Sequence, residues 1–436
     1  MLANAVVLAG FAVVPFIPFI ILSNSTFFPF IVGKNFAFRI VVEVMFSAWL
    51  VLAILDPAYR PKKSHLLVTL AVFIGIITLA AIFGENPTKS FWSNFERMEG
   101  VVTYFHLAAY FLVASTVLTV RGLWTHFLSI LVGAGILMSL YGLLQAGGQL
   151  DVVQDGIRVN GTLGNAAYLG SYLLLNIFLF AFLLLQSKSK DDVRRRLQVV
   201  TLPWLMGAGL FIFYVFQNYS NRIEESLARG GDGLVPFFIE QVNALRLPEW
   251  IASLTNEKGL FILSFLFIFF LCFSYIFAKK ISTRYVTFVV SFFGSLGLFL
   301  FSFVLYHTAT RGAILGFLAG AGLATLLIAI FERERTLLRR GAIGILVALT
   351  LFVGGFMAVR DATFVRESPV LSRFASISLD EQTTKSRFMI WGMAIEGFKE
   401  HPVLGWGMEN FNYVFNEYYN PRMYSQEQWF DRAHNV

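Results

Sequence analysis

Long apolar segments recur along almost the whole chain, and they constrain its fold more than any other feature. Each is about 20 residues long, enough to cross roughly 30 Å of hydrocarbon as a helix. Hydrocarbon offers no partners for backbone polar groups, so spanning segments of this kind fold as helices. Hydrophobic residues make up 57% of the 436 residues and charged residues only 14%, too apolar a composition for a soluble domain of this length. The sequence predicts an all-α polytopic membrane protein.

The apolar pattern predicts about eleven transmembrane helices, with ends uncertain by several residues. The expected spans are 2–22, 36–55, 66–83, 101–120, 124–146, 164–186, 199–217, 259–278, 284–306, 312–331 and 341–359. We expect residues 1–359 to form this helical bundle and residues 360–436 to form a large loop on one side of it.

Basic residues mark one set of short loops and so predict the orientation. Sixteen Lys and Arg residues lie in loops on one side, and six lie in the opposite short loops and their flanks. The positive-inside rule places the richer set in the cytoplasm. The richer set is Arg60, Lys62, Lys63, Arg121, Lys188, Lys190, Arg194, Arg195, Arg196, Lys279, Lys280, Arg284, Arg333, Arg335, Arg339 and Arg340. We therefore expect the N-terminus inside and the large C-terminal loop outside.

The net charge of +7 comes mostly from the basic residues of the predicted cytoplasmic loops. No basic–aromatic module for binding nucleic acid occurs in the sequence.

The only cysteine, Cys272, lies within a span, so no disulfide can form within the chain. Segment 218–258 is the other long outer segment, and we interpret it as an interfacial helix. In the C-terminal loop we expect a helix from about 384 to 400. Its one apolar face would carry Phe388, Trp391, Ile395 and Phe398.

Two arginines share one setting on the predicted outer side. Arg158 and Arg311 each stand at the mouth of a helix, with small residues following. Arginine makes bidentate, permanently charged contacts with phosphate, so two arginines at one depth could clamp a diphosphate. Position alone leaves open a second interpretation, in which each arginine reaches the lipid headgroups.

The last polar cluster holds the candidate for proton transfer. His434 lies close to Asp431 and Asn435, and a neutral imidazole there could take a proton from a hydroxyl. A structural role for His434 is equally compatible with the sequence. No Asp-x-Asp pair occurs on the outer side and no zinc-type cluster occurs at all, which favours a reaction that needs neither metal nor cofactor. Glu43 lies inside the second span and stays unassigned.

Taken together, these patches resemble the O-antigen ligase and O-antigen polymerase superfamily of bacterial envelope enzymes. The similar elements are Gly33-Lys34, Ser90-Phe91-Trp92 through Arg97 and Gly100, Arg158 through Asn165, Thr310-Arg311-Gly312-Ala313, Arg387 … Trp391 … His401-Pro402 … Gly405-Trp406-Gly407 … Phe411, and Asp431-Arg432-Ala433-His434-Asn435. Their order and their common placement on the outer side make the resemblance fairly specific.

The resemblance implies a GT-C-like fold in the bacterial inner membrane, with the site facing the periplasm. It implies a polyprenyl-diphosphate-linked glycan as donor and a glycolipid, glycan or protein hydroxyl as acceptor. By this comparison Arg158 and Arg311 hold the diphosphate and His434 activates the acceptor. The substrate contacts would be Arg97, Asn160, Asn165, Asp431, Arg432 and Asn435. Members of the family continue beyond the His motif, so either this sequence is a fragment that lacks the last helices or the catalytic role of His434 does not hold.

Other classes of function remain open from the sequence. A polymerase that joins repeat units would share the same elements. A solute or anion transporter could line its path with the same arginines, although transporters typically show internal repeats and broken spans, which we do not find. A non-catalytic component of an envelope assembly complex is a third alternative.

Overall fold

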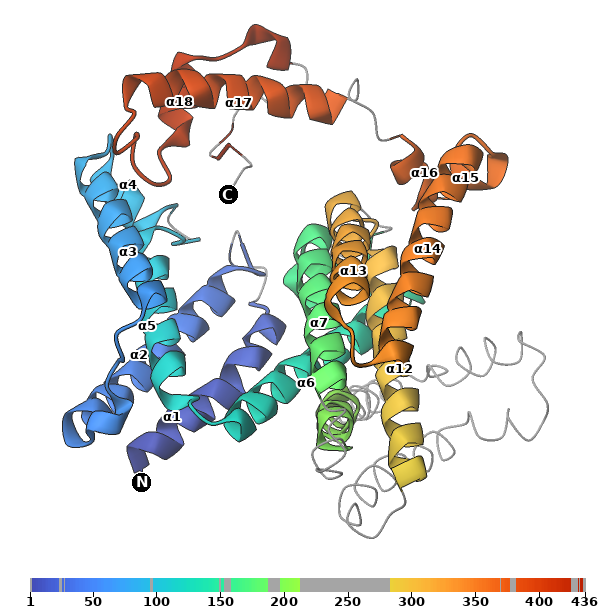
Figure 1. Cartoon of the computed structure of the whole chain (residues 1–436). Coiled ribbons are helices and arrows are strands. Elements are labelled where there is room, and N and C mark those ends of the chain that lie inside the picture. The colour runs from blue at the N-terminus through green and yellow to red at the C-terminus, as the bar shows by residue number, and fades with distance from the viewer. Residues whose placement is uncertain are drawn as a thin grey trace, which may run out of the picture. The chain divides into compact units, whose positions relative to one another are not determined.

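All regular structure in the described part of the chain is helical (Figure 1). The computed structural model describes residues 2–22, 26, 28–94, 97–148, 150–152, 158–186, 197–211, 283–368, 370–376, 382–424, 430 and 432–433. These residues contain no strand, and the predicted all-α class is confirmed.

Long helices account for most of this structure. They are α1 (Leu2–Val13, continued by the 3-10 helix η1, Val14–Phe19), α2 (Val32–Leu55), α3 (His65–Phe83), α5 (Val101–Val117), α6 (Arg121–Ala146), α7 (Ala166–Gln186), α12 (Thr283–His307), α13 (Arg311–Phe331), α14 (Thr336–Val359) and α17 (Gln382–Glu400). The short elements are η2 (Pro57–Tyr59), α4 (Pro87–Trp92), η3 (Gly161–Leu163), α15 (Thr363–Glu367), α16 (Leu371–Ala375), α18 (Phe411–Glu417) and η5 (Pro421–Met423).

The helices agree with the predicted spans. Within the described residues, eight are long and apolar enough to cross a membrane, and the apolar helices Val101–Val117 and Leu197–Phe211 are shorter. The predicted span 259–278 and the predicted interfacial helix in 218–258 lie outside the described residues. The class of polytopic membrane protein is therefore confirmed, while the exact number of spans stays a prediction.

Local sequence explains where the first loops begin and end. Ser64 precedes α3, and its Oγ accepts a hydrogen bond from Leu67 N at 3.1 Å. Asn86 precedes α4, and its Oδ1 accepts from Lys89 N at 3.0 Å. Both are N-caps that satisfy backbone donors left over in the first turn of a helix. Pro87 at the first position of α4 has no N–H to lose. The loop between α3 and α5 thus has a defined structure.

The chain divides into two compact units. The first consists of Met1–Leu123 with Thr325–Val436, and the second of Trp124–Ala324. In the first unit, α2 packs against α1 and α5, and α3 packs against α4 and α5. In the second unit, α12 packs against α7. The expected boundary near residue 360 stays a prediction.

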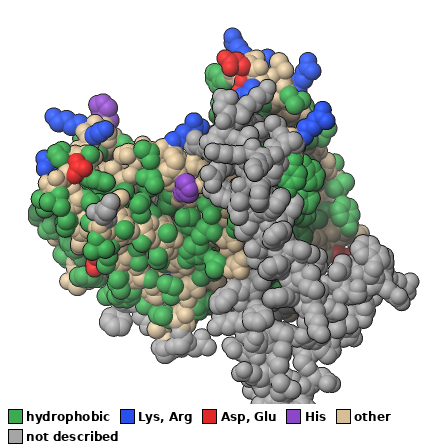
Figure 2. All heavy atoms as spheres, turned by 90° about the horizontal axis from the view of Figure 1, so that it is seen from below, with side chains coloured by type: hydrophobic (Ala, Val, Ile, Leu, Met, Phe, Trp, Pro, Cys, Tyr) green, Lys and Arg blue, Asp and Glu red, His purple; other side chains and the backbone are tan. Residues whose placement is uncertain are grey.

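Much of the helical surface is apolar, as a lipid-facing surface must be. Leu327 on α13 and Leu351 and Phe352 on α14 are all exposed. Figure 2 shows a face on which hydrophobic side chains predominate and charged side chains form a few small groups. A helix that is hydrophobic all round and exposed in water would be unstable, whereas in a bilayer it is a normal span.

Candidate functional site

The first candidate site lies in the second unit, at the turn between α12 and α13. The turn consists of Thr308, Ala309 and Thr310, and Thr310 N donates to Thr308 Oγ1 at 3.3 Å. Ala309 has a φ of 48°, which is the left-handed region that a non-glycine residue adopts only at a cost. Arg311 is the first residue of α13. A strained turn therefore sets the backbone position of Arg311 at the start of α13.

Arg158 binds this same turn from a segment 150 residues earlier in the chain. Its Nε donates to Thr308 O at 3.1 Å, and its Nη2 donates to Thr310 Oγ1 at 3.2 Å. The backbone also joins here, because Val159 N donates to His307 O at 3.2 Å. The structure thus brings Arg158 to the residue that immediately precedes Arg311, while the shared role of the two arginines stays a prediction.

Two helices begin together at this position. Thr310 Oγ1 donates to Ala166 O at 3.0 Å, which ties the start of α13 to the start of α7. One turn into α7, a Cβ on Gly170 would lie 2.9 Å from Ala313 Cβ, so the lack of a side chain permits the close approach. Helix N-termini carry partial positive charge. Two arginines and two helix N-termini therefore make this end of the second unit strongly favourable for an anion.

Asn160 and Asn165 shape the loop that carries Arg158. Asn160 is buried, and its Oδ1 accepts from Gln145 Nε2 at 3.0 Å. Gln145 Oε1 in turn accepts from Gly161 N at 2.7 Å. Asn165 Oδ1 accepts from Ala167 N at 2.7 Å, at the start of α7. The sequence did not single out Gln145, because one polar residue near the end of an apolar helix gives no recognisable signal.

The second candidate site lies in the first unit, where the loop between α3 and α5 is hydrogen-bonded to the turn before α18, residues 406–410. Glu85 N donates to Trp406 O at 3.0 Å, and Ser90 Oγ donates to Met408 O at 2.8 Å. Asn410 Nδ2 donates to Ser90 Oγ at 3.1 Å. Lys89 Nζ also donates to Asn412 Oδ1. Two patches more than 300 residues apart in the chain thus form one interlocked structure.

Arg432 lies at the centre of this second site. Its Nη2 is 2.8 Å from Glu99 Oε2 and 3.0 Å from Glu409 Oε1. Ser93 Oγ donates to Glu409 Oε2 at 2.6 Å. Burial disfavours the charge of Arg432, but the hydrogen bonds and charges of the two carboxylates outweigh it and raise the pKa of the guanidinium above its ordinary value. Arg432 is therefore held as a cation between two acids.

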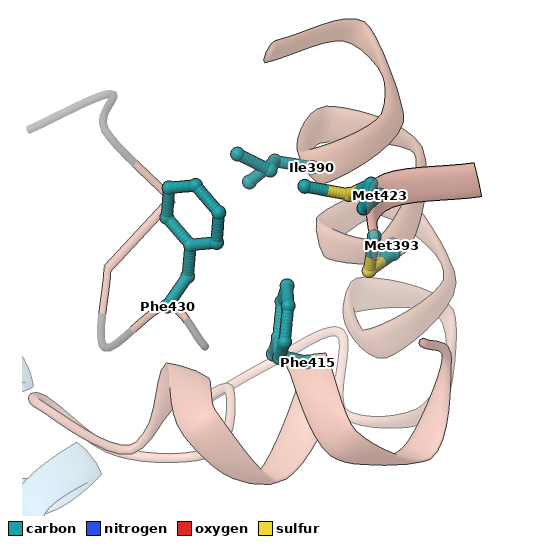
Figure 3. Packing of buried hydrophobic residues seen from close by; sticks show 5 residues of the cluster. All are labelled: Ile390, Met393, Phe415, Met423 and Phe430. Atoms are coloured by element: carbon teal, nitrogen blue, oxygen red, sulfur yellow. The ribbon is translucent and has the colours of Figure 1, made fainter. Parts of the chain in front are cut away.

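The segment before Arg432 is anchored by an apolar cluster. Ile390 and Met393 on α17, Phe415 on α18, Met423 and Phe430 are all buried together (Figure 3). The rings of Phe415 and Phe430 lie 5.5 Å apart. The predicted helix 384–400 is confirmed as α17, and its expected apolar face is present but exposed at Phe388, Ile395 and Phe398. The face that packs inside the protein is a second one.

Arg97 has a different environment from Arg432. Its guanidinium lies over the ring of Phe28, 4.5 Å from the centroid, and its backbone oxygen accepts from Asn35 Nδ2 at 2.8 Å. Arg39, buried on α2, donates to Met98 O and to Thr103 Oγ1. Arg39 and Asn35 thus shape the Arg97 loop, and sequence reasoning did not assign either a role. Asp431, His434 and Asn435 lie outside the described residues.

Left-handed backbone marks both sites. Among the described residues, the non-glycine positions with positive φ are Ser93, Met98, Ala309 and Glu409. Ala309 belongs to the arginine turn, and the other three belong to the interlocked loops around Arg432. Strained backbone persists where the surroundings over-determine it, and it concentrates at functional sites.

The fold and the two sites define a polytopic helical membrane protein with an arginine-rich turn between α12 and α13 and a structured C-terminal loop. Residues 296–436 match the family model described as O-antigen ligase, a range that includes Arg311, α17 and Arg432. This match supports the resemblance to the O-antigen ligase superfamily that the sequence elements indicated. No curated protein and no solved structure matches it.

The match bears on the class of function. It supports a membrane glycan enzyme of the O-antigen ligase or polymerase type.

Proposed function

We propose that this protein transfers a glycan from a polyprenyl-diphosphate-linked donor to an acceptor hydroxyl, at the periplasmic face of the membrane and without a metal ion. One observation carries the proposal. Arg158 is bonded to the turn that starts α13 at Arg311, where the N-termini of α7 and α13 also meet. This concentration of fixed positive charge suits a diphosphate, which is the charged part of such a donor.

The proposed reaction breaks one bond and forms one. The bond between the anomeric carbon of the glycan and the diphosphate oxygen breaks, and the electron pair leaves with the polyprenyl diphosphate. A bond forms between that carbon and the acceptor oxygen, whose proton passes to His434 as general base. Arg158 and Arg311 stabilise the negative charge that develops on the departing diphosphate, which is the role a divalent ion has in other transferases.

The remaining proposed substrate contacts have weaker support. They are Arg97, Asn160, Asn165, Asp431 and Asn435. A polymerase would use the same donor chemistry with a second lipid-linked unit as acceptor, so the identity of the acceptor distinguishes the two alternatives. An anion transporter would bind diphosphate at the same arginines but would transfer no glycan.

Direct binding of polyprenyl diphosphate to the full-length protein in detergent micelles tests the arginine pair. Hydrogen bonds to charged groups are worth about 1.5–3 kcal/mol, so Arg158→Ala and Arg311→Ala should each weaken binding by roughly 10- to 150-fold. The matched control is Arg366→Ala, which removes an exposed arginine paired with Asp361 at 3.4 Å. Equal affinity in all four proteins would refute the clamp.

A further inference from the structure

The ion-paired state of Arg432 fits poorly with a direct contact to the diphosphate. Two carboxylates, Glu99 and Glu409, face one guanidinium, so the cluster carries a net negative charge when all three groups are ionised. Such a cluster repels the diphosphate that the proposed donor carries. Glu409 is also deeply buried, with 7% of its side chain exposed, and it holds a further hydrogen bond from Ser93. Arg432 therefore needs a different role from the one its position in the motif predicts.

We propose that Arg432 is a positioning residue: its ion pairs with Glu99 and Glu409 fix the end of the C-terminal loop in register on the loop before α5. The role matters for catalysis because His434 follows only two residues later. This inference rests on the proposed function, in which His434 is the general base.

Two anchors of different kind hold this segment. Phe430 fills the apolar cluster with Phe415 and Met423, and Arg432 reaches the two acids. Apolar contacts are not directional, so the cluster holds the segment without fixing its rotation or its exact register. Hydrogen bonds to charged groups are directional, and Nη2 of Arg432 makes them to two carboxylates from different loops, which constrains both the rotation and the register. In the sequence, Phe430, Arg432 and His434 are each two residues apart, so the two anchors directly precede the proposed base.

The acids are themselves held in place by the rest of the first unit. Glu99 follows Met98, whose backbone oxygen accepts from the buried Arg39. Glu409 precedes Asn410, which is fully buried and bonded to Ser90. Met98 and Glu409 both have left-handed backbone, at φ 49° and 63°. The surrounding structure thus maintains a strained backbone just before Glu99 and at Glu409 itself, as expected where the placement of side chains matters.

The test combines an activity-independent measurement with kinetics. Ala433→Cys, in the full-length protein with Cys272→Ala, reports the accessibility of the segment by its rate of reaction with a maleimide. Three variants each remove one charge. The Gln side chain has the shape of Glu in Glu99→Gln and Glu409→Gln, and it is shorter than the original side chain in Arg432→Gln. Because a partly buried pair is worth more than an exposed one, each should raise the labelling rate by about tenfold. Arg432→Lys keeps the charge and should show a smaller rise.

The matched control lies in the same loop. Lys399 and Glu396 form an exposed ion pair at 2.7 Å on α17, and Glu396→Gln should leave the labelling rate unchanged. In proteoliposomes with a polyprenyl-diphosphate-linked glycan, the Glu99, Glu409 and Arg432 variants should lower kcat and leave KM for the donor unchanged, because the base is displaced while the donor site is intact.

Two results would overturn the inference. One is a raised KM for the donor in Arg432→Gln with unchanged labelling at position 433, which would make Arg432 a substrate ligand. The other is unchanged labelling and unchanged kcat in all three variants, which would make the ion pairs incidental. If the unaltered protein transfers no glycan, the proposed function fails, and the labelling rates still decide whether the ion pairs fix the segment.

Discussion

One methyl group at Gly84 probes how tightly the turn before α18 is docked on the loop after α3. A Cβ on Gly84 would lie 2.7 Å from Gly407 Cα and 2.7 Å from Trp406 O. Both are backbone atoms, so the two segments must move apart to relieve the overlap. The φ of Gly84 is −77°, which alanine adopts without strain. The same Cβ would also lie 2.7 Å from Ala80 O, so Gly84→Ala strains the end of α3 as well as the docked turn, and the assay must report on the turn itself.

The magnitude follows from two contributions. Overpacking a close contact costs about 1–3 kcal/mol. Separation of the segments also removes the hydrogen bond from Glu85 N to Trp406 O, which is worth about 0.5–1.5 kcal/mol net. We expect Gly84→Ala to destabilise the docked turn by about 2–4 kcal/mol, which is roughly 30- to 1,000-fold in the docking equilibrium.

A cysteine at position 90 provides the assay. Ser90 is fully buried beneath Met408 and Asn410, so the maleimide reaction of Ser90→Cys requires the turn to open. The measurement compares labelling rates with and without Gly84→Ala, in the protein with Cys272→Ala. Labelling should be faster with the methyl group by the factor given above.

Gly75→Ala is the matched control, because it adds a methyl group within α3, the helix that Gly84 follows, where nothing lies within 4 Å of the new Cβ. It should leave labelling at position 90 unchanged. If Gly84→Ala and Gly75→Ala gave the same labelling rate, the close contact between Gly84 and Gly407 would not hold the turn.

Three further predictions concern the site and the orientation. Arg158→Lys should restore donor binding only weakly relative to Arg158→Ala, because lysine lacks the planar fork that reaches both Thr308 and Thr310; equal binding by Lys and Arg would contradict this. His434→Ala should lower kcat by about 10²–10⁴-fold and still bind the donor, whereas turnover at the normal rate would exclude it as the base. In intact cells, a membrane-impermeant maleimide should label cysteines introduced at positions 232 and 425 but not one at position 192. If position 425 were accessible only from the cytoplasm, the predicted orientation would be wrong.

The spans were the most predictable part of the fold. Apolar segments of about 20 residues specify helices through the properties of hydrocarbon alone, and the observed bounds of α6, α7 and α13 lie within three residues of the expected ones. The helix α17 was also predicted correctly. Its buried face was not, because Ile390 and Met393 follow the same helical spacing as the exposed Phe388 and Ile395. Periodicity alone does not distinguish two apolar faces of one helix.

The arginine pair was predictable as a pattern, but its partners were not. Similar settings of Arg158 and Arg311 in the sequence indicated a common depth. The structure joins Arg158 to the turn before Arg311, and the joint binding of a diphosphate stays a prediction. The meeting of the α7 and α13 N-termini depends on packing between helices far apart in the chain, which no local pattern contains. The same holds for Glu409, whose carboxylate matters only because Arg432 and Ser93 reach it across the fold.

The initial rate of glycan transfer in proteoliposomes is the measurement that tests the central claim most directly. The full-length protein would be supplied with a polyprenyl-diphosphate-linked glycan and an acceptor, in the presence of a metal chelator. We expect transfer to continue with the chelator present and to be abolished in Arg311→Ala at an unchanged protein level. Transfer that requires a divalent ion, or an Arg311→Ala protein with full activity, would contradict a metal-free diphosphate clamp.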